Sequence, residues 1–447
     1  MTNKSRYLII LLGTLVFAVL APLIVLYVRG ITFNFQTRSF EATGIIAISS
    51  EPKTADIFLN GKLAKHGSGD IKFLSPGEYQ LELKNDGYYS WNKRFKVMPG
   101  EVTLASAFNS VYLFLSQPKE QTISQDVLDF YSGSGRLAYL TSSAIFINPL
   151  GSSASPQSYT LPKPAGTGQS YGINKILAQD EAAKNFVLGS DNPASPLFVF
   201  NSNTGSFYNI TGLFELAPKM QFGSNGSLYA LDGGILYSVN AENKTKNPLF
   251  KKVKAFYPFF ESLYFVEDTS SSGTTATGSG NYSLLISQAP FKDSQTLLNN
   301  IPRFEAGADL FVTFEKQIFL LFGGSLYLAS PHMQKLADNI SAWNFNQNNT
   351  FPVLHAGQLD YYDPLSHKLN FVTRLSGTLT DPVINTSVGG AFFIKDNTLV
   401  EIELDTRNNQ NQYTLYTGQP LQKFSVDAEG KNVVVLDDGI LKNLVVR

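Results

Sequence analysis

The strongest constraint on this chain is a strand–turn–strand unit that recurs through residues 118–447. In each copy an apolar strand leads into a polar turn and a second apolar strand, and no long helical periodicity interrupts the series. Several copies continue through a Gly-containing turn into a third strand. The polar turns lie at 132–135, 179–181, 224–226, 348–349 and 427–430, with less regular copies near Glu261, Lys316 and Gly390. The Gly-containing turns lie at 233–234, 323–324 and 438–439.

The spacing of these units predicts an all-β chain with a β-propeller-like domain over 118–447. About seven intervals separate Gly135 from Gly430, so each interval is about 42 residues, the length of a four-stranded blade. About eight hairpins indicate seven or eight blades. A pair of β-sandwiches, or another repeat-built β structure, is the alternative. The low-complexity run 270–280 is interpreted as a loop within one blade.

The last unit stops after its third strand, which raises the question of how the ring closes. Propellers often take the missing strand from the other end of the domain. Two segments are candidates for that strand: Val111 to Ser116, and the stretch before Phe130.

The second constraint is an uncharged apolar run over residues 7–28. As a helix it would measure about 33 Å, which matches the hydrocarbon core of a bilayer. Tyr7 and Tyr27 lie at its two ends, where amphipathic rings favour the membrane interface. We therefore predict a transmembrane helix over 7–28, followed by a linker over 29–42.

The topology follows from the short segment before this helix. Residues 1–6 carry Lys4 and Arg6 and are easily retained in the cytoplasm, so the body of the chain is predicted to be extracytoplasmic. A cleaved signal peptide is the competing interpretation, because Val19 to Ala21 loosely resembles a cleavage site. Against cleavage, Pro22 would follow the cut directly and the apolar run continues to Val28.

Residues 43–116 form a separate small β unit. Its strongest signal is Asn60-Gly61, a hairpin turn that follows the strand-like segment Asp56 to Leu59. The segment 79–83 then alternates apolar and polar residues as a half-buried strand does, and a further strand runs from Trp91 to Val97.

The turn residues of this unit resemble those of the PEGA domain family. The matching residues, in the family's order and spacing, are Ser50, Pro52, Ala55, Phe58, Leu59, Asn60, Gly61, Lys62, Pro76, Gly77, Glu78, Tyr79, Gly87 and Tyr88. The resemblance implies a small β-sandwich of the kind found in surface-layer and other envelope-associated proteins. It implies no catalytic residues.

Composition excludes several functional classes. The chain has 35 basic and 36 acidic residues and a formal net charge of −1, so nothing in its charge draws it to nucleic acid, which normally needs a clustered basic face. It has no cysteine, which excludes disulfides, thiolate metal sites and a cysteine nucleophile.

The motifs that could carry chemistry are weak. The pattern Gly-x-Ser-x-Gly occurs at 168–172 but lacks the strand and helix that a hydrolase elbow needs, so it is interpreted as a loop between blades. The four histidines have no short metal-ligand spacing and are His66, His332, His355 and His367. Acids at predicted strand ends are expected to cap turns, namely Asp360, Asp363, Asp437 and Asp438. We assign no catalytic, cofactor-binding or metal-ligating residue and no cofactor.

These observations predict a single-pass, membrane-anchored surface protein of the cell envelope that binds or scaffolds a partner and is not an enzyme. Its partners are expected to be the membrane and an envelope protein or glycan, and no nucleic acid. Two alternatives remain. The first is a propeller enzyme acting on glycans or peptides, and the second is a sensor or assembly factor that works with another membrane protein.

Overall fold

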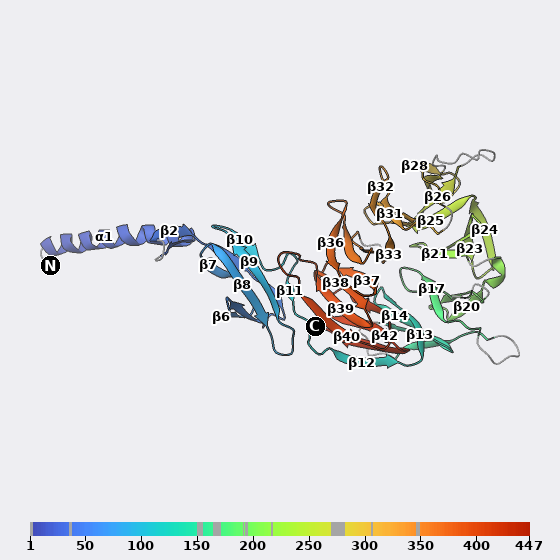
Figure 1. Ribbon diagram of the computed structural model, residues 1–447, viewed down its shortest axis with the longest axis horizontal. Helices are drawn as coiled ribbons and strands as arrows, with labels where there is room; N and C mark the ends of the chain where they lie inside the picture. Colours follow the sequence, from blue (N-terminus) through green and yellow to red (C-terminus); the bar gives the residue numbers. More distant parts are fainter. Residues whose placement is uncertain are drawn as a thin grey trace.

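The computed structural model describes residues 3–34, 38–149, 155–163, 171–190, 192, 195–215, 218–269, 282–304, 307–345 and 349–447. An N-terminal helix, a small β domain and a large β domain follow one another along the longest axis of the molecule (Figure 1). Both the low-complexity run 270–280 and Gly168 to Ser170 of the Gly-x-Ser-x-Gly pattern lie outside the described residues.

Helix α1 spans Asn3–Val28 and confirms the predicted N-terminal apolar helix. Its segment Ile10–Val28 is long and apolar enough to cross a membrane, and none of that segment is buried by the rest of the chain. A signal sequence would have the same length and composition. After the helix, the predicted linker contains a two-stranded antiparallel hairpin formed by β1 (Ile31–Asn34) and β2 (Ser39–Ala42).

The small domain packs a four-stranded sheet in the order β6-β5-β8-β9 against shorter strand pairings. Strands β5 and β6 meet at the turn of Asn60 and Gly61, whose φ angles of 50° and 76° suit a type I′ hairpin. The strands of this domain are β3 (Gly44–Ala47), β4 (Ser50–Glu51), β5 (Asp56–Leu59), β6 (Lys62–His66), β7 (Ile71–Leu74), β8 (Gly77–Lys84), β9 (Trp91–Val97), β10 (Val102–Leu104) and β11 (Val111–Tyr112).

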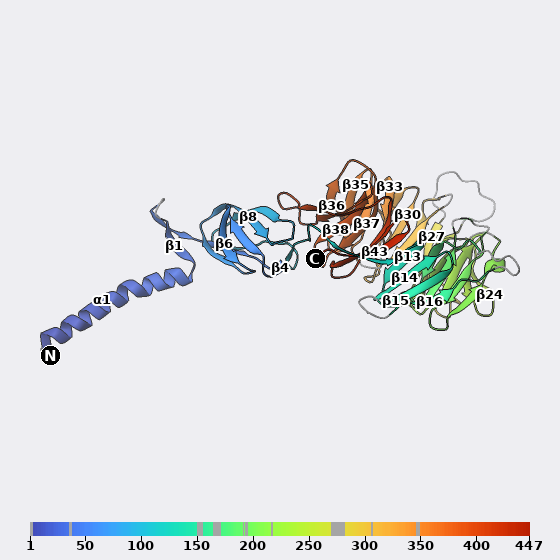
Figure 2. The same cartoon turned by 90° about the horizontal axis from the view of Figure 1, so that it is seen from below.

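The large domain consists of four-stranded antiparallel sheets arranged as the blades of a propeller (Figures 1 and 2). Eight such sheets are present among the described residues, within the predicted range of seven or eight. The first four contain β13 (Val127–Gly133), β14 (Arg136–Thr141), β15 (Ala144–Pro149) and β16 (Gln157–Thr160); β17 (Lys175–Gln179), β18 (Asn185–Gly189), β19 (Phe198–Asn201) and β20 (Ser206–Asn209); β21 (Lys219–Phe222), β22 (Leu228–Asp232), β23 (Ile235–Asn240) and β24 (Thr245–Phe250); and β25 (Val253–Phe259), β26 (Ser262–Asp268), β27 (Tyr282–Gln288) and β28 (Gln295–Ile301).

The remaining blades complete the ring. They contain β29 (Asp309–Val312), β30 (Ile318–Phe322), β31 (Ser325–Leu328) and β32 (Gln334–Ala337); β33 (Ile340–Trp343), β34 (Pro352–His355), β35 (Gln358–Asp363) and β36 (Lys368–Arg374); β37 (Leu379–Asn385), β38 (Gly390–Lys395), β39 (Thr398–Glu403) and β40 (Gln412–Thr417); and β41 (Leu421–Val426), β42 (Asn432–Asp437), β43 (Ile440–Val445) and β12 (Lys119–Ser124). A short 3-10 helix, η1 (Thr211–Leu213), follows β20.

The last blade joins the two ends of the large domain. Strand β12 pairs antiparallel with β43, so the fourth strand of this blade comes from the segment before Phe130, one of the two predicted sources. The other predicted source, Val111 to Ser116, does not close the ring. Its strand β11 instead pairs in parallel with β4 of the small domain.

Candidate functional site

The first strands of all eight blades, β13, β17, β21, β25, β29, β33, β37 and β41, line one central cavity of about 1820 Å³. The turns that connect first and second strands contribute Gly133 to Gly135, Phe222 to Ser224 and Asp427 to Glu429, so the cavity extends to that face of the propeller. This face carries the polar turns that the sequence pattern identified. Its position at the centre of the ring, lined by every blade, makes it the default place for a ligand.

One side of the cavity is an aromatic wall built from three neighbouring blades. Trp343 and Phe345 line the cavity and are half-buried, and the buried ring of Phe311 lies 4.6 Å and 4.2 Å from their ring centroids. Tyr257 extends the wall, with its ring centroid 6.0 Å from that of Phe345. Phe314, in the turn after β29, also lines the cavity and is 48% exposed. These rings offer apolar contact area to a ligand.

The opposite side carries carboxylates that serve the fold. Asp180 accepts hydrogen bonds from the backbone N–H of Lys184 at 2.7 Å and from the Asn185 side chain at 2.7 Å. Asp427 accepts the same pair of bonds from Lys431 and Asn432 at 2.8 Å each. Both aspartates therefore hold their own turns closed, which is the capping role expected of a blade-turn aspartate.

The acids and histidines singled out from the sequence lie elsewhere. Asp360 is bonded to His355 at 2.8 Å and Asp363 accepts the backbone N–H of Leu365 at 3.1 Å. Asp437 accepts the backbone N–H of Gln419 at 2.7 Å. Neither these acids, nor Asp438, nor the four histidines line the central cavity. Within the described ranges, no group of three or more His, Asp or Glu side chains could hold a metal ion.

The histidines are dispersed over two domains. His66 lies on β6 of the small domain, 2.7 Å from Asp56. His332 lies in the turn between β31 and β32, and His367, in the turn between β35 and β36, lies 3.1 Å from the Tyr362 hydroxyl.

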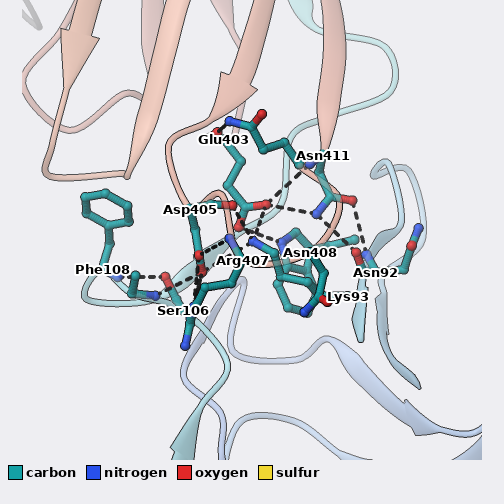
Figure 3. Close-up of polar contacts among 12 residues, drawn as sticks. Asn92, Lys93, Ser106, Phe108, Glu403, Asp405, Arg407, Asn408 and Asn411 are labelled. Carbon is teal, nitrogen blue, oxygen red and sulfur yellow. Dashed lines mark hydrogen bonds and ion pairs between the residues drawn. The ribbon is translucent and has the colours of Figure 1, made fainter. Parts of the chain in front are cut away.

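A second polar site joins the small domain to the propeller (Figure 3). At its centre the Lys93 side chain, on β9, is completely buried and its Nζ lies 3.0 Å from Glu403 Oε2 and 3.3 Å from Asp405 Oδ2. The same Nζ donates a hydrogen bond of 2.8 Å to the backbone oxygen of Asp405. A buried ammonium group is tolerated only when charges and hydrogen bonds compensate it, and here the other domain supplies both.

Arg407 completes the charge balance of this site. Its Nε donates to both carboxylate oxygens of Asp405, at 2.9 Å and 3.1 Å, and its Nη1 donates to the backbone oxygen of Leu104 in the small domain at 3.2 Å. Burial acts to raise the pKa of Asp405, but the hydrogen bonds from Arg407 and the charge of Lys93 outweigh it and lower that pKa to about 2. The carboxylate is therefore ionised at any physiological pH.

Neutral groups extend the contact around the charged centre. The indole N–H of Trp91 donates to Glu403 at 3.2 Å. Asn411 pairs with the backbone of Asn92 in both directions, at 3.3 Å and 3.2 Å, so that the propeller loop continues the hydrogen bonding of β9. Phe108 packs against Gly389, where an added Cβ would lie 2.4 Å from the Phe108 ring.

This junction was not predicted, although one signal for it was present. Strand β9 buries every second residue, which places Lys93 on the same buried face as Trp91, Phe95 and Val97. A lysine in an apolar register requires a partner. Its acidic partners lie about 310 residues later in the chain, and no local pattern identifies them.

Comparison with known proteins assigns the small domain. Residues 43–108 match the PEGA domain family. This match confirms the family resemblance that the turn residues of the small domain indicated, and the small domain is called the PEGA domain below. No curated protein matches the sequence.

Solved structures similar to this chain include a WD40 domain and a propeller. The C-terminal WD40 domain of Sif2 has a TM-score of 0.50 at 12% identity, and the match covers 75% of this chain and 99% of that chain. The Dos1 propeller has a TM-score of 0.48 at 11% identity, covering 74% and 94%. A crystal structure of the eukaryotic initiation factor has a TM-score of 0.47 at 12% identity, covering 73% and 85%. At this identity the Sif2 match supports the propeller fold and nothing further.

Glu401 lies behind the PEGA–propeller junction, beside a cavity of about 20 Å³ that is large enough for one water molecule. Trp91 and Phe114 also line this cavity. Glu401 is fully buried, and its Oε2 and the Tyr413 hydroxyl have no hydrogen-bond partner in the part of the chain that is described. Burial, reinforced by the charge of Glu403, raises the pKa of Glu401 well above 4.5 despite the opposing effect of Arg447.

Replacing Glu401 with Gln is expected to stabilise the protein at high pH and to leave it unchanged at pH 4. The pKa of this carboxyl is higher in the folded state than its unfolded value of about 4.5. Its contribution to the folding stability is therefore complete below the unfolded pKa and is lost as the pH rises toward the folded pKa. Glutamine keeps the shape but does not titrate. Thermal unfolding of both proteins between pH 4 and pH 9 tests this, with the exposed Glu261→Gln as the matched control. Parallel curves for wild type and Glu401→Gln would contradict it.

Proposed function

We propose that this chain is a single-pass, membrane-anchored binding protein of the cell envelope, with its PEGA domain and propeller outside the cytoplasm and no enzymatic activity. The propeller-like fold and the PEGA domain suggest a binding or scaffold role. The apolar helix α1 supports the anchor, and PEGA domains suit an extracytoplasmic setting.

The PEGA domain acts in this proposal as a rigid spacer. Lys93 is enclosed by Glu403 and Asp405, and Arg407 reaches back to the PEGA backbone at Leu104. Tyr89 adds a hydrogen bond of 2.9 Å to the Thr414 backbone oxygen. A flexible tether would make no such buried contacts, so the propeller is held in one orientation relative to the PEGA domain.

The aromatic wall of the central cavity is the single observation that carries the binding role. Trp343, Phe345 and Phe314 present partly exposed rings at a concave surface, and partly exposed aromatic anchors in a pocket are typical of protein-binding hot spots. Among the carboxylates that line the cavity, Asp180 and Asp427 are committed to turn capping. Two others, Asp309 and Glu429, form ion pairs with lysines. We therefore propose a protein partner that inserts an apolar segment at this wall.

Photo-crosslinking in the source cells tests this partner. With p-benzoylphenylalanine in place of Phe314, the full-length chain is expected to form one discrete adduct, which mass spectrometry of the purified product identifies as an envelope protein. The matched control is Leu365, which is 91% exposed on the turn between β35 and β36 and outside the cavity. Identical adducts at both positions, or none at Phe314, would overturn the proposed partner. A glycan adduct would replace it with a glycan.

A further inference from the structure

We propose that the β1–β2 hairpin is a second membrane contact, whose apolar face lies in the lipid interface beside the end of α1. This proposal rests on the proposed function, because it requires α1 to span the membrane. It adds a surface and a partner, the lipid bilayer on the propeller side, that the anchor alone does not imply.

The hairpin is amphipathic because of its strand register. Phe33 pairs with Phe40 and Ile31 with Ala42, so these four apolar residues share one face of the two-stranded sheet. Thr32, Asn34, Ser39 and Glu41 occupy the other face, where Asn34 donates a hydrogen bond to Glu41 at 2.9 Å. The two phenylalanine rings meet edge to face at 5.3 Å, yet Phe33 is 41% and Phe40 58% exposed.

The position of the hairpin relative to the helix is fixed. Strand β1 begins at Ile31, three residues after α1 ends at Val28. Immediately after β2, Thr43 returns to the helix end and donates to the Gly30 backbone oxygen from both its N–H at 2.8 Å and its hydroxyl at 2.6 Å. The base of the hairpin is therefore clamped at the membrane end of the chain.

The direction of the hairpin favours lipid as its partner. In Figure 2 the hairpin turns back toward the side of the helix instead of extending toward the PEGA domain. Tyr27, in the last turn of α1, stacks on Phe73 of the PEGA domain at 4.7 Å, so other aromatic rings lie at the same level. Tyrosine and tryptophan side chains are enriched at this level of a bilayer. The basic residues Arg29 and Arg38, both exposed, suit lipid phosphates there.

The stability of the hairpin also favours lipid as its partner. An isolated two-stranded hairpin is marginal in water and needs an apolar surface to pack against. The apolar medium nearest to Phe33 and Phe40 is the bilayer that α1 enters a few residues earlier. A second copy of the chain could also cover these rings, and the experiment separates the two cases.

Spin labelling tests the proposal directly, because the chain has no native cysteine. The full-length protein, reconstituted at one copy per lipid nanodisc, carries a nitroxide at one of four substitutions: Phe40→Cys, Thr32→Cys on the polar face, Leu20→Cys within α1, or Leu365→Cys on the propeller. Phe33→Cys repeats the test if Phe40→Cys disturbs the hairpin. Collision rates with oxygen and with a water-soluble nickel chelate report the depth of each label.

The expected ratio of oxygen to nickel collisions is highest at Leu20, several-fold higher at Phe40 and Phe33 than at Thr32, and lowest at Leu365. A water-like ratio at Leu20 would show that α1 does not span, which refutes the proposed anchor. A lipid-like ratio at Leu20 with a water-like ratio at both phenylalanines overturns the hairpin proposal alone. If the label at Phe40 is shielded from the nickel chelate only in discs that hold two copies of the chain, the hairpin proposal is also overturned, in favour of a contact between chains.

Discussion

Replacing Lys93 with Met is expected to weaken the docking of the PEGA domain on the propeller by about 3–5 kcal/mol. Methionine retains much of the apolar stem but removes the charge that Glu403 and Asp405 share. Arg407 still neutralises Asp405, whereas Glu403, only 14% exposed, keeps its hydrogen bond from Trp91 but loses its ion-pair partner. The loss arises from this unpaired partner more than from the missing bond.

Hydrogen exchange measures this loss at the amides that cross the junction. The N–H groups of Asn92 and Ala107 donate to the propeller side chains Asn411 and Asp405, and their exchange reports opening of the junction. Exchange faster by about 100-fold corresponds to a loss of roughly 3 kcal/mol. Lys84→Met is the matched control, because Lys84 is half-exposed and its pair with Glu82 is worth under about 1 kcal/mol. Equal protection in both variants would show that the junction does not depend on Lys93.

Replacing Phe319 with Ala is expected to destabilise the propeller by about 3–5 kcal/mol. Phe319 is fully buried between two blades, with its ring 5.0 Å from Phe351 and 4.8 Å from Tyr362. It also supports Phe311 at 5.2 Å, on which Trp343 of the aromatic wall stacks. The cavity left by alanine therefore removes the support of the proposed binding surface as well as core packing.

Urea unfolding followed by circular dichroism measures the stability loss, and crosslinking from position 314 measures the effect on the wall. Phe371→Ala is the matched control, because Phe371 is half-exposed on β36 of the neighbouring blade and its loss is expected to cost under about 1 kcal/mol. If Phe319→Ala unfolds at the same urea concentration as wild type, the predicted loss of stability is wrong. Unchanged crosslinking from position 314 would show that Phe319 does not support the wall.

The substitutions at Lys93 and Phe319 test two different parts of the molecule. Lys93 determines how the propeller is oriented on the PEGA domain, whereas Phe319 determines the shape of the surface that the propeller presents. The proposed role as a binding protein fixed to a membrane requires both, because the proposed envelope partner would meet the cavity only at the height and angle that the PEGA domain allows. The hairpin at the helix end would restrict that geometry further by holding the base of the PEGA domain at the lipid surface.

Several features were predictable because they depend on neighbouring residues. The uncharged run 7–28 predicted a helix of membrane length, and α1 ends at the same residue, Val28. Asn60-Gly61 predicted a hairpin because these residues adopt positive φ at low cost, and β5 and β6 join there. The Gly-containing turn 233–234 likewise joins β22 and β23.

Other features had a visible signal but no visible partner. The closing strand had two sequence candidates of similar character, and only the packing of β11 against β4 leaves β12 to pair with β43. Lys93 lay in an apolar register, but Glu403 and Asp405 are more than 300 residues away in the sequence. The apolar face of the β1–β2 hairpin was hidden in a segment too short and too polar for its period to stand out.

The sequence by itself determined the local elements of this protein: an apolar helix, a PEGA domain recognised by its turns, and a series of about eight strand–turn units. Only the tertiary structure decided which strand closes the ring, which acids compensate Lys93 and which rings form the wall of the central cavity. The physical reason is the separation along the sequence of the residues that interact. Helix length, strand alternation and turn chemistry depend on residues within a few positions of each other, whereas closure, charge compensation and cavity shape depend on contacts between residues that folding alone brings together.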